Sequence, residues 1–136
     1  MKNIYRPATI DDAEDLLRWK NQADTRRFTI ETHKKIKMKD HLAWLKKKLE
    51  EGKMKIWIIE GVGNVRIENN EIALAIDTQF QGLGIAAMAI KDFSQPGMLA
   101  KIVEGNIASM RLFIKCGYKP IAYNDKKHFY TFQCQK

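Results

Sequence analysis

Two glycines, Gly82 and Gly84, stand between an apolar run typical of a buried strand and an apolar run typical of a short helix. The first run is EIALAID (71–77) and the second is IAAMAIKDF (85–93). Protein chains use a Gly-rich bend that leads into a helix to hold a phosphate group on backbone N–H donors. The stretch therefore predicts a strand, a tight bend and a helix in succession, with a phosphate site at the bend.

The rest of the chain alternates between strand-like and helix-like patterns. Strands are expected at 3–8, 55–61, 63–69, 71–77, 99–105, 118–123 and 128–134, and helices are expected from Thr9, around Leu42 to Leu49, from Ile85 and from Asn106. The polar stretch 21–35 is too irregular to assign. The order β-α-α-β-β-β-α-β-α-β-β predicts a mixed α/β (α+β) fold around one central sheet, with residues 1–136 forming a single domain.

Local signals mark several boundaries of these elements. Thr9 followed by Asp12 matches a capping box at the start of the first helix. Asn69-Asn70 is a plausible tight turn between two strands, and Gly117 suits the end of the helix that Asn106 begins.

The formal net charge is +8, from 24 basic and 16 acidic residues. Such an excess favours an anionic partner, which includes nucleic acid, a membrane surface and a phosphorylated small molecule. Much of the excess lies in 33–55, where a solvated lysine face on an amphipathic helix also explains it. Nucleic acid is disfavoured because no zinc-finger, RRM-like or KH-like pattern occurs.

Neither a membrane span nor a metal site is expected. The chain has no apolar run of about 18 residues, and its first residues lack an apolar signal region. Cys116 and Cys134 alone provide neither a disulfide framework nor a zinc-ligand spacing. A cytoplasmic protein is the simplest expectation.

Two familiar phosphate loops fit the glycines poorly. A Walker A loop ends in Gly-Lys-Ser/Thr, and residues 84–86 contain neither the lysine nor the hydroxyl. Residues 82–87 match the Rossmann pattern G-x-G-x-x-A, with Glu104 about 20 residues further on as a ribose-binding acid. However, residues 78–81 separate the strand from Gly82, and too little chain follows Glu104 to complete a dinucleotide fold.

The spacing Gln79-x-x-Gly82-x-Gly84 resembles the Gln/Arg-x-x-Gly-x-Gly/Ala loop of the GNAT superfamily of N-acetyltransferases, which holds the pyrophosphate of acetyl-CoA. A second segment, Asn106 to Tyr118, resembles that family's N-x-x-S-x-x-L-[YF]-x-x-x-G-[FY] pattern, a helix beside the pantetheine arm. Both motifs occur in the family's order and at its strand and helix positions. The resemblance implies a GNAT-like fold, acetyl-CoA as the acetyl donor and a primary amine as the acceptor.

The resemblance continues upstream. Segments 5–21 and 40–52 are similar to a GNAT branch that includes amino-sugar N-acetyltransferases, which act on nucleotide-linked aminosugars. Related sequences acetylate protein N-termini, including those of ribosomal proteins. An aminosugar is therefore the favoured acceptor, with a protein or peptide N-terminus as the alternative. A catalytically weak acyl-CoA-binding module is the alternative outside the enzymes, and the expected assembly is a monomer or a homodimer.

The resemblance places the cofactor against the end of strand 71–77, the bend and helix 106–116. The residues so implied are Leu74, Ala75, Ile76, Gln79, Gln81, Gly82, Leu83, Gly84, Ile85, Ala86, Asn106, Ser109 and Phe113. A backbone N–H around 74–76 is the family's usual donor to the thioester carbonyl. Asn106 also suits the N-cap of its helix. Strand 71–77 is expected to splay from strand 99–105 and open a slot for the thioester.

The general acid and the general base of the transfer each have more than one candidate. Glu104 and Glu71 are candidates for the general base, and each is also an ordinary strand-end carboxylate. Phe113 stands where many family members place a tyrosine that protonates the leaving thiolate, so its role here is packing. Tyr118, Tyr123 or water is expected to supply that proton.

The acceptor site is expected between the polar stretch 21–35 and the closing strands. Arg26, Arg27, Thr32 and His33 lie in that stretch. The two arginines suit an acceptor phosphate, with ordinary surface chemistry as the alternative.

Overall fold

The computed structural model describes residues 4–30 and 33–136. Its strands are β1 (Tyr5–Pro7), β2 (Lys55–Ile59), β3 (Gly63–Glu68), β4 (Glu71–Ile76), β5 (Leu99–Val103), β6 (Tyr118–Asn124) and β7 (Phe129–Cys134). Its helices are α1 (Ala13–Lys20), α2 (Ala23–Arg27), α3 (Met38–Glu51), α4 (Ile85–Phe93) and α5 (Ile107–Lys115), with 3₁₀ turns at Ile10–Asp12 and Thr78–Phe80. Within these described ranges, no helix combines the length and the hydropathy needed to cross a bilayer.

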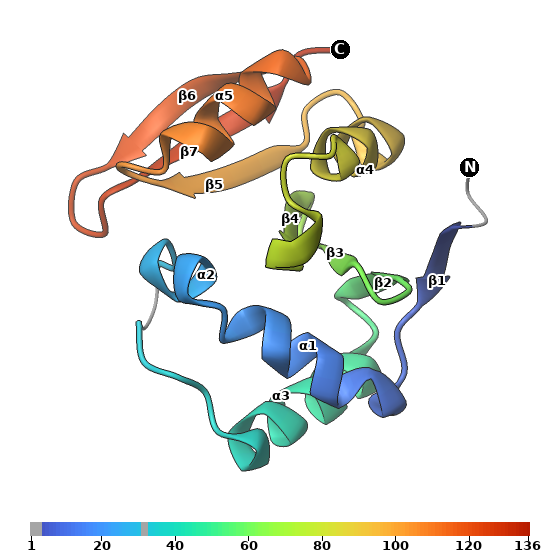
Figure 1. The fold of residues 1–136 in the computed structure, drawn as a ribbon. Coiled ribbons are helices and arrows are strands. Elements are labelled where there is room, and N and C mark those ends of the chain that lie inside the picture. The colour runs from blue at the N-terminus through green and yellow to red at the C-terminus, as the bar shows by residue number, and fades with distance from the viewer. Residues whose placement is uncertain (1–3, 31–32) are drawn as a thin grey trace.

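The strands form one mixed sheet in the order β1-β2-β3-β4-β5-β7-β6. Neighbouring strands are antiparallel except β4 and β5, which are parallel. Figure 1 shows α4 and α5 on one side of the sheet and α1, α2 and α3 on the other. The predicted mixed α/β fold and the predicted order of elements are confirmed, with α2 added inside the stretch that the sequence left unassigned. That helix has five residues, no side-chain cap and no buried residue, so it leaves no periodic pattern in the sequence.

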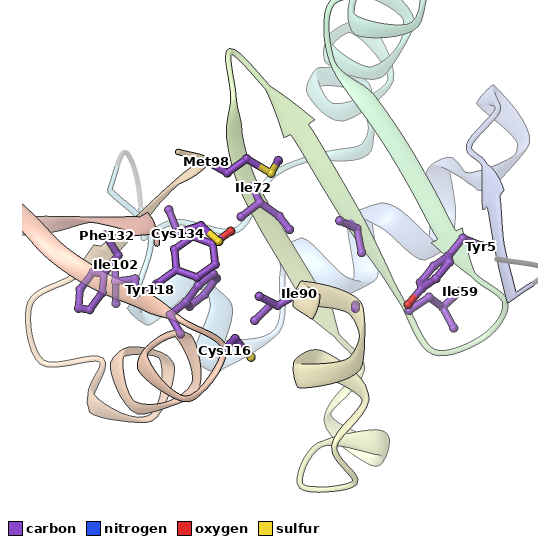
Figure 2. Packing of buried hydrophobic residues seen from close by; sticks show 14 residues of the cluster. Tyr5, Ile59, Ile72, Ile90, Met98, Ile102, Cys116, Tyr118, Phe132 and Cys134 are labelled. Atoms are coloured by element: carbon purple, nitrogen blue, oxygen red, sulfur yellow. The ribbon is translucent and has the colours of Figure 1, made fainter. Parts of the chain in front are cut away.

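Hydrophobic clusters attach the helices to both faces of the sheet. On the α4 and α5 side, Figure 2 shows a cluster that extends from Tyr5 and Ile59 to Ile102 and Phe132. On the other side, a cluster from α1, α3 and β2 includes Trp19, Leu45, Ile56 and Ile58. Trp19 and Leu45 are both 0% exposed. Full burial of each such side chain contributes about 1.5–3 kcal/mol, so the two helices are held firmly against the sheet.

The predicted local signals are also confirmed. Asp12 Oδ2 accepts a hydrogen bond from Thr9 N at 2.8 Å and completes the capping box. Asn69 and Asn70 have φ of 53° and 62°, both in the left-handed region. Two such residues make the turn type that matches the twist of an antiparallel hairpin, here between β3 and β4.

The parallel strands β4 and β5 meet at only one point. Their register pairs Glu71 with Leu99, and Leu99 N donates to Asn70 O at 2.8 Å. Beyond that point β4 stays paired with β3, and β5 stays paired with β7. The predicted splay between the two strands is therefore confirmed, and it leaves one edge of β4 without a neighbouring strand.

Asp77 anchors the free end of β4 to α1. Its side chain is 5% exposed and accepts hydrogen bonds from the guanidinium of Arg18 and from Trp19 Nε1, the latter at 3.2 Å. Its other oxygen accepts from Gln79 N at 3.1 Å. The bond from Gln79, followed by the Arg18 guanidinium, lowers the pKa of the Asp77 carboxyl from its ordinary value. The stabilisation is therefore complete above the unfolded pKa of about 4 and is lost as pH falls through the lower folded pKa.

We expect Asp77→Asn to destabilise the protein at neutral pH, because the amide carries no charge to pair with Arg18. The difference in unfolding free energy between wild type and variant should shrink as pH falls below about 4, because the unfolded wild type then binds a proton at Asp77 that the folded protein, with its lower pKa, does not yet bind. Urea unfolding at about pH 7 and about pH 3.5 measures this difference. Asp125→Asn, at an exposed turn, is the control. A difference that does not change with pH would contradict the expectation.

Candidate active site

A cleft of about 790 Å³ lies where β4 and β5 separate. Its walls come from β4 (71–76), the bend and the start of α4 (80–82 and 84–87), β5 (100–103), α5 with its cap (106, 108, 109, 112 and 113), residues 24, 25 and 28–30 around α2, and Arg66 of β3. Every residue that the resemblance assigned to the cofactor lines this cleft except Gln79 and Leu83.

The open edge of β4 presents the backbone groups of Leu74 and Ile76. In an extended strand, the N–H and C=O groups of alternate residues point to the same edge. Asp77 N donates to Val62 O at 2.7 Å, on the β3 side. The groups of Leu74 and Ile76 therefore point to the opposite edge, where the cleft lies, and those of Ala75 point to β3. Within the predicted donor segment 74–76, the edge offers Leu74 and Ile76 to a ligand.

Side chains take the place of β5 at the end of β4. Ile76 O accepts from Gln22 Nε2 and from Gln81 Nε2, each at 3.3 Å. Gln22 Oε1 in turn accepts from Thr78 N at 2.9 Å. The junction between α1 and α2 therefore satisfies backbone groups that a paired β5 would otherwise satisfy, and the cleft stays open.

The glycine bend leads directly into the N-terminus of α4. Gly82 and Gly84 both have φ of 81°, and a Cβ at either position would meet no heavy atom within 4 Å. Glycine is therefore favoured there by backbone conformation and not by crowding. The first bond of α4 runs from Met88 N to Gly84 O at 3.1 Å, so the amides of 85–87 have no partner within the helix. These donors and the positive end of the helix dipole attract an anion.

Helix α5 forms the opposite wall. Asn106 Oδ1 accepts from Ser109 N at 3.3 Å, which confirms the predicted N-cap. Phe113 is buried, and its ring meets the ring of Tyr118 edge-on with centroids 4.9 Å apart. Phe113 therefore contributes apolar surface to the cleft and has no proton to donate.

Glu71 and Glu104 are placed differently. Glu71 lines the cleft, with Oε1 3.3 Å from Lys101 Nζ. Glu104 is exposed, does not line the cleft, and accepts from the hydroxyl of Tyr123 at 2.7 Å. Glu71 is therefore the predicted carboxylate within reach of a ligand in the cleft.

Neither predicted tyrosine lines the cleft. Tyr118 is 2% exposed and shares a hydrogen bond with Ser94 Oγ at 2.6 Å. Burial raises the pKa of its hydroxyl. The hydrogen bond to Glu104 raises the pKa of Tyr123 to about 12. Neither tyrosine is therefore placed to protonate a leaving group in the cleft, and water is the remaining one of the three predicted proton sources.

The polar stretch reaches the cleft through residues other than those predicted. Arg26, Arg27 and His33 do not line it. Arg26 and His33 contact each other instead: the ring Nδ1 of His33 lies 2.7 Å from the backbone oxygen of Arg26. Thr32 lies outside the described residues. Residues 24, 25 and 28–30 line the cleft because α2 turns them toward it, and no sequence pattern announces that short helix.

Arg66 is a cleft residue that sequence reasoning missed. Its Nε is buried and has no hydrogen-bond partner among the described residues. Burial lowers the pKa of its guanidinium, and the charge of Glu71 acts in the opposite direction. The sequence signal that could have found Arg66 is its position in GNVRIE, where Asn64 and Arg66 alternate with apolar residues. Polar side chains at alternate positions of an inner strand indicate a face that is not pure core.

Comparison with known families identifies the class of protein that this fold and cleft define. The sequence model described as "Acetyltransferase (GNAT) domain" matches residues 3–119. The chain therefore belongs to the GNAT acetyltransferase family and is an acyltransferase of the N-acetyltransferase type. A comparison with curated proteins finds no match.

Solved structures share the fold at low sequence identity. A domain from Methanocaldococcus jannaschii has a TM-score of 0.81 at 22% identity, covering 98% of this chain and 97% of that one. Spermidine N-acetyltransferase from Vibrio cholerae, in complex with CoA and spermine, has a TM-score of 0.78 at 14% identity, covering 95% and 91%. Ribosomal-protein-alanine N-acetyltransferase from Brucella melitensis has a TM-score of 0.71 at 18% identity, covering 97% and 99%.

The family membership excludes the Walker A and Rossmann interpretations of the bend. It does not select the aminosugar branch, because similar structures include spermidine and ribosomal-protein acetyltransferases. In the described part of the chain, no group of three or more His, Cys, Asp or Glu residues is arranged to hold a metal ion.

We expect Arg66→Met to leave the stability unchanged or to raise it, because the buried Nε of this half-buried side chain has no hydrogen-bond partner among the described residues and carries a desolvation cost. Urea unfolding of this variant and of Arg111→Met on α5 measures the effect against a matched control. A loss of about 3 kcal/mol, the cost of breaking a paired buried charge, would show instead that Glu71 stabilises Arg66 as an ion pair.

Proposed function

We propose that this protein is an acetyl-CoA-dependent N-acetyltransferase that moves an acetyl group directly to a primary amine while donor and acceptor are bound together. One observation carries the proposal: the open edge of β4 and the N–H donors of the bend belong to the same cleft. The open edge suits an extended ligand that hydrogen-bonds as a neighbouring strand does, and the N–H donors of the bend suit a pyrophosphate.

The bend and the first turn of α4 are suited to the pyrophosphate of coenzyme A. The pantetheine arm would lie along β4, with Leu74 and Ile76 as its backbone partners and with Asn106 and Ser109 across the cleft. Leu83 is 67% exposed, so its backbone and not its side chain would take part. Gln79, outside the cleft lining, has the least support among the cofactor residues.

The transfer forms a C–N bond to the acceptor and breaks the C–S bond of the thioester. The amine attacks in its neutral form, and we assign Glu71 to take its proton, directly or through one water. The N–H of Leu74 or Ile76 would donate to the carbonyl oxygen as negative charge develops there. Water would protonate the departing thiolate, because Phe113 has no hydroxyl.

The favoured acceptor is an aminosugar, including a nucleotide-linked one, and the resemblance of 5–21 and 40–52 supports it. The alternative acceptor is a protein or peptide N-terminus, which the fold shared with a ribosomal-protein-alanine acetyltransferase favours. The phenylalanine at 113 favours the remaining alternative, a catalytically weak acyl-CoA-binding module. The proposal includes a cytoplasmic location and a monomer or homodimer.

Thermal unfolding with acetyl-CoA, CoA, NADH and ATP at equal concentration tests the cofactor. A ligand at about 100 times its Kd adds about 2.7 kcal/mol, a shift of several degrees for a domain of this size. We expect a rise with acetyl-CoA and CoA alone. Thiol release on addition of an amine then separates an enzyme from a binding module. A cooperative melt that neither CoA species shifts would overturn the proposal.

We expect Gly84→Ala to weaken CoA binding, with Gly52→Ala as a matched control. Gly84 and Gly52 have φ of 81° and 71°, and a Cβ at either meets no atom within 4 Å. Both variants should therefore lose about 1 kcal/mol of stability through backbone strain. The Kd for CoA by calorimetry should rise by about tenfold for the bend variant alone. Equal affinities for the two variants would place the pyrophosphate elsewhere.

A further inference from the structure

Lys20 is the last residue of α1, at the place where α1 packs against both α3 and β3. Its Nζ lies 3.1 Å from the ring centroid of Trp44 on α3, and the residue is half-buried. His41, which is 1% exposed, stacks on Trp44 with ring centroids 5.8 Å apart. The amine of Lys20 is therefore held against an aromatic surface and is partly removed from water.

The charged groups that act on this amine are cations. Arg66 on β3 and Lys48 on α3 both face Lys20 with like charge. Glu68 on β3 is bound to Lys48, whose Nζ lies 3.2 Å and 3.1 Å from its two oxygens. Burial, followed by the charge of Lys20, lowers the pKa of His41, so its ring stays neutral at pH 7. Within residues 4–30 and 33–136, no carboxylate forms an ion pair with Lys20.

These surroundings favour the neutral amine. Burial and then the charges of Arg66 and Lys48 lower the pKa of Lys20 to about 7. The ring of Trp44 attracts an ammonium group by about 0.5–2 kcal/mol, which is at most about 1.5 pKa units and does not restore the ordinary value. An ordinary lysine is neutral in less than about one molecule in a thousand at pH 7. Lys20 therefore holds a far larger fraction of the nucleophilic form.

We propose that Lys20 is a modification site, activated by its burial beside Arg66 and Lys48, whose Nζ takes an acyl group from an acyl thioester. The Nζ lone pair attacks the thioester carbonyl, a C–N bond forms, and the C–S bond breaks. The thiolate leaves, and the proton of the amine passes to water. The inference goes beyond the proposed acetyl transfer, because the acceptor is a residue of the chain itself and no ligand is needed at the bend.

The modification has a consequence for the cleft. The product is a neutral amide, so it removes the positive charge that faces Arg66. Arg66 lines the cleft, whereas Lys20 does not. The state of Lys20 would therefore act on the charge of the cleft wall from behind β3.

The test measures the acetylation of individual lysines by mass spectrometry of peptides. The full chain is incubated at about pH 7.5 with S-acetyl-N-acetylcysteamine, a thioester that lacks the nucleotide part of CoA. We expect Lys20 to be acetylated at least about tenfold faster than Lys47, an exposed residue of α3. The rate at Lys20 should level off above about pH 9, whereas the rate at an ordinary lysine rises to about pH 10.

Paired variants assign the reactivity to the cation cluster. Arg66→Met removes a like charge, so the pKa of Lys20 should rise and its acetylation at about pH 7.5 should slow by about threefold or more. Arg111→Met, at an exposed position of α5, should leave the rate unchanged.

Three results would overturn the modification site: acetylation of Lys20 no faster than that of Lys47, a Lys20 rate that still rises at about pH 10, or an unchanged rate in Arg66→Met. The reagent does not require the bend. A failure of CoA to bind would therefore overturn the proposed function and leave this test intact.

Discussion

The separation of β4 from β5 is the constraint on which the rest of this structure depends. An inner strand normally satisfies its backbone groups on both sides, and buried groups without partners are costly. Here β5 meets β4 only at Glu71 and Leu99, and the side chains of Gln22 and Gln81 take over at Ile76. The protein thus retains a length of inner strand as an open edge, and that edge lies beside the N-terminal end of α4.

The two separated strands are held from opposite directions. The end of β4 is attached to α1 through Asp77, which accepts hydrogen bonds from Arg18 and Trp19 of that helix. The hydrophobic cluster that includes Leu45 and Ile58 packs α1 against the sheet. β5 is held by its ladder with β7. Closing the cleft would therefore require both attachments to change, so its open form is built into the packing.

Charge divides the cleft into regions with different chemistry. The bend offers backbone donors without a side-chain cation among the described residues that line it. At the far end, Glu71 Oε1 lies 3.3 Å from Lys101 Nζ, and the charge of Glu71 also acts on Arg66. Glu71 lines this end of the cleft, where we propose that the acceptor amine binds.

Local patterns in the sequence determined most of the elements and much of the cleft wall that the bend and α5 form. The capping box at Thr9, the turn at Asn69-Asn70 and the bend at Gly82 and Gly84 each depend on a few adjacent residues, so their spacing alone predicts them. The residues that we propose for the cofactor come from that same bend, from the strand before it and from the segment that Asn106 begins, and all of them except Gln79 and Leu83 line one cleft.

Only the tertiary structure decided which polar side chains meet at the end of the cleft beside Glu71. Glu71 and Glu104 both flank strands in the sequence, yet the splay brings Glu71 into the cleft while Glu104 bonds to Tyr123 at the surface. Arg66 joins Glu71 because β3 lies beside β4, a long-range pairing that no local spacing encodes. The physical reason is that helix caps and turns are set by neighbours in the chain, whereas a charged site is assembled from strands and loops that only packing brings together.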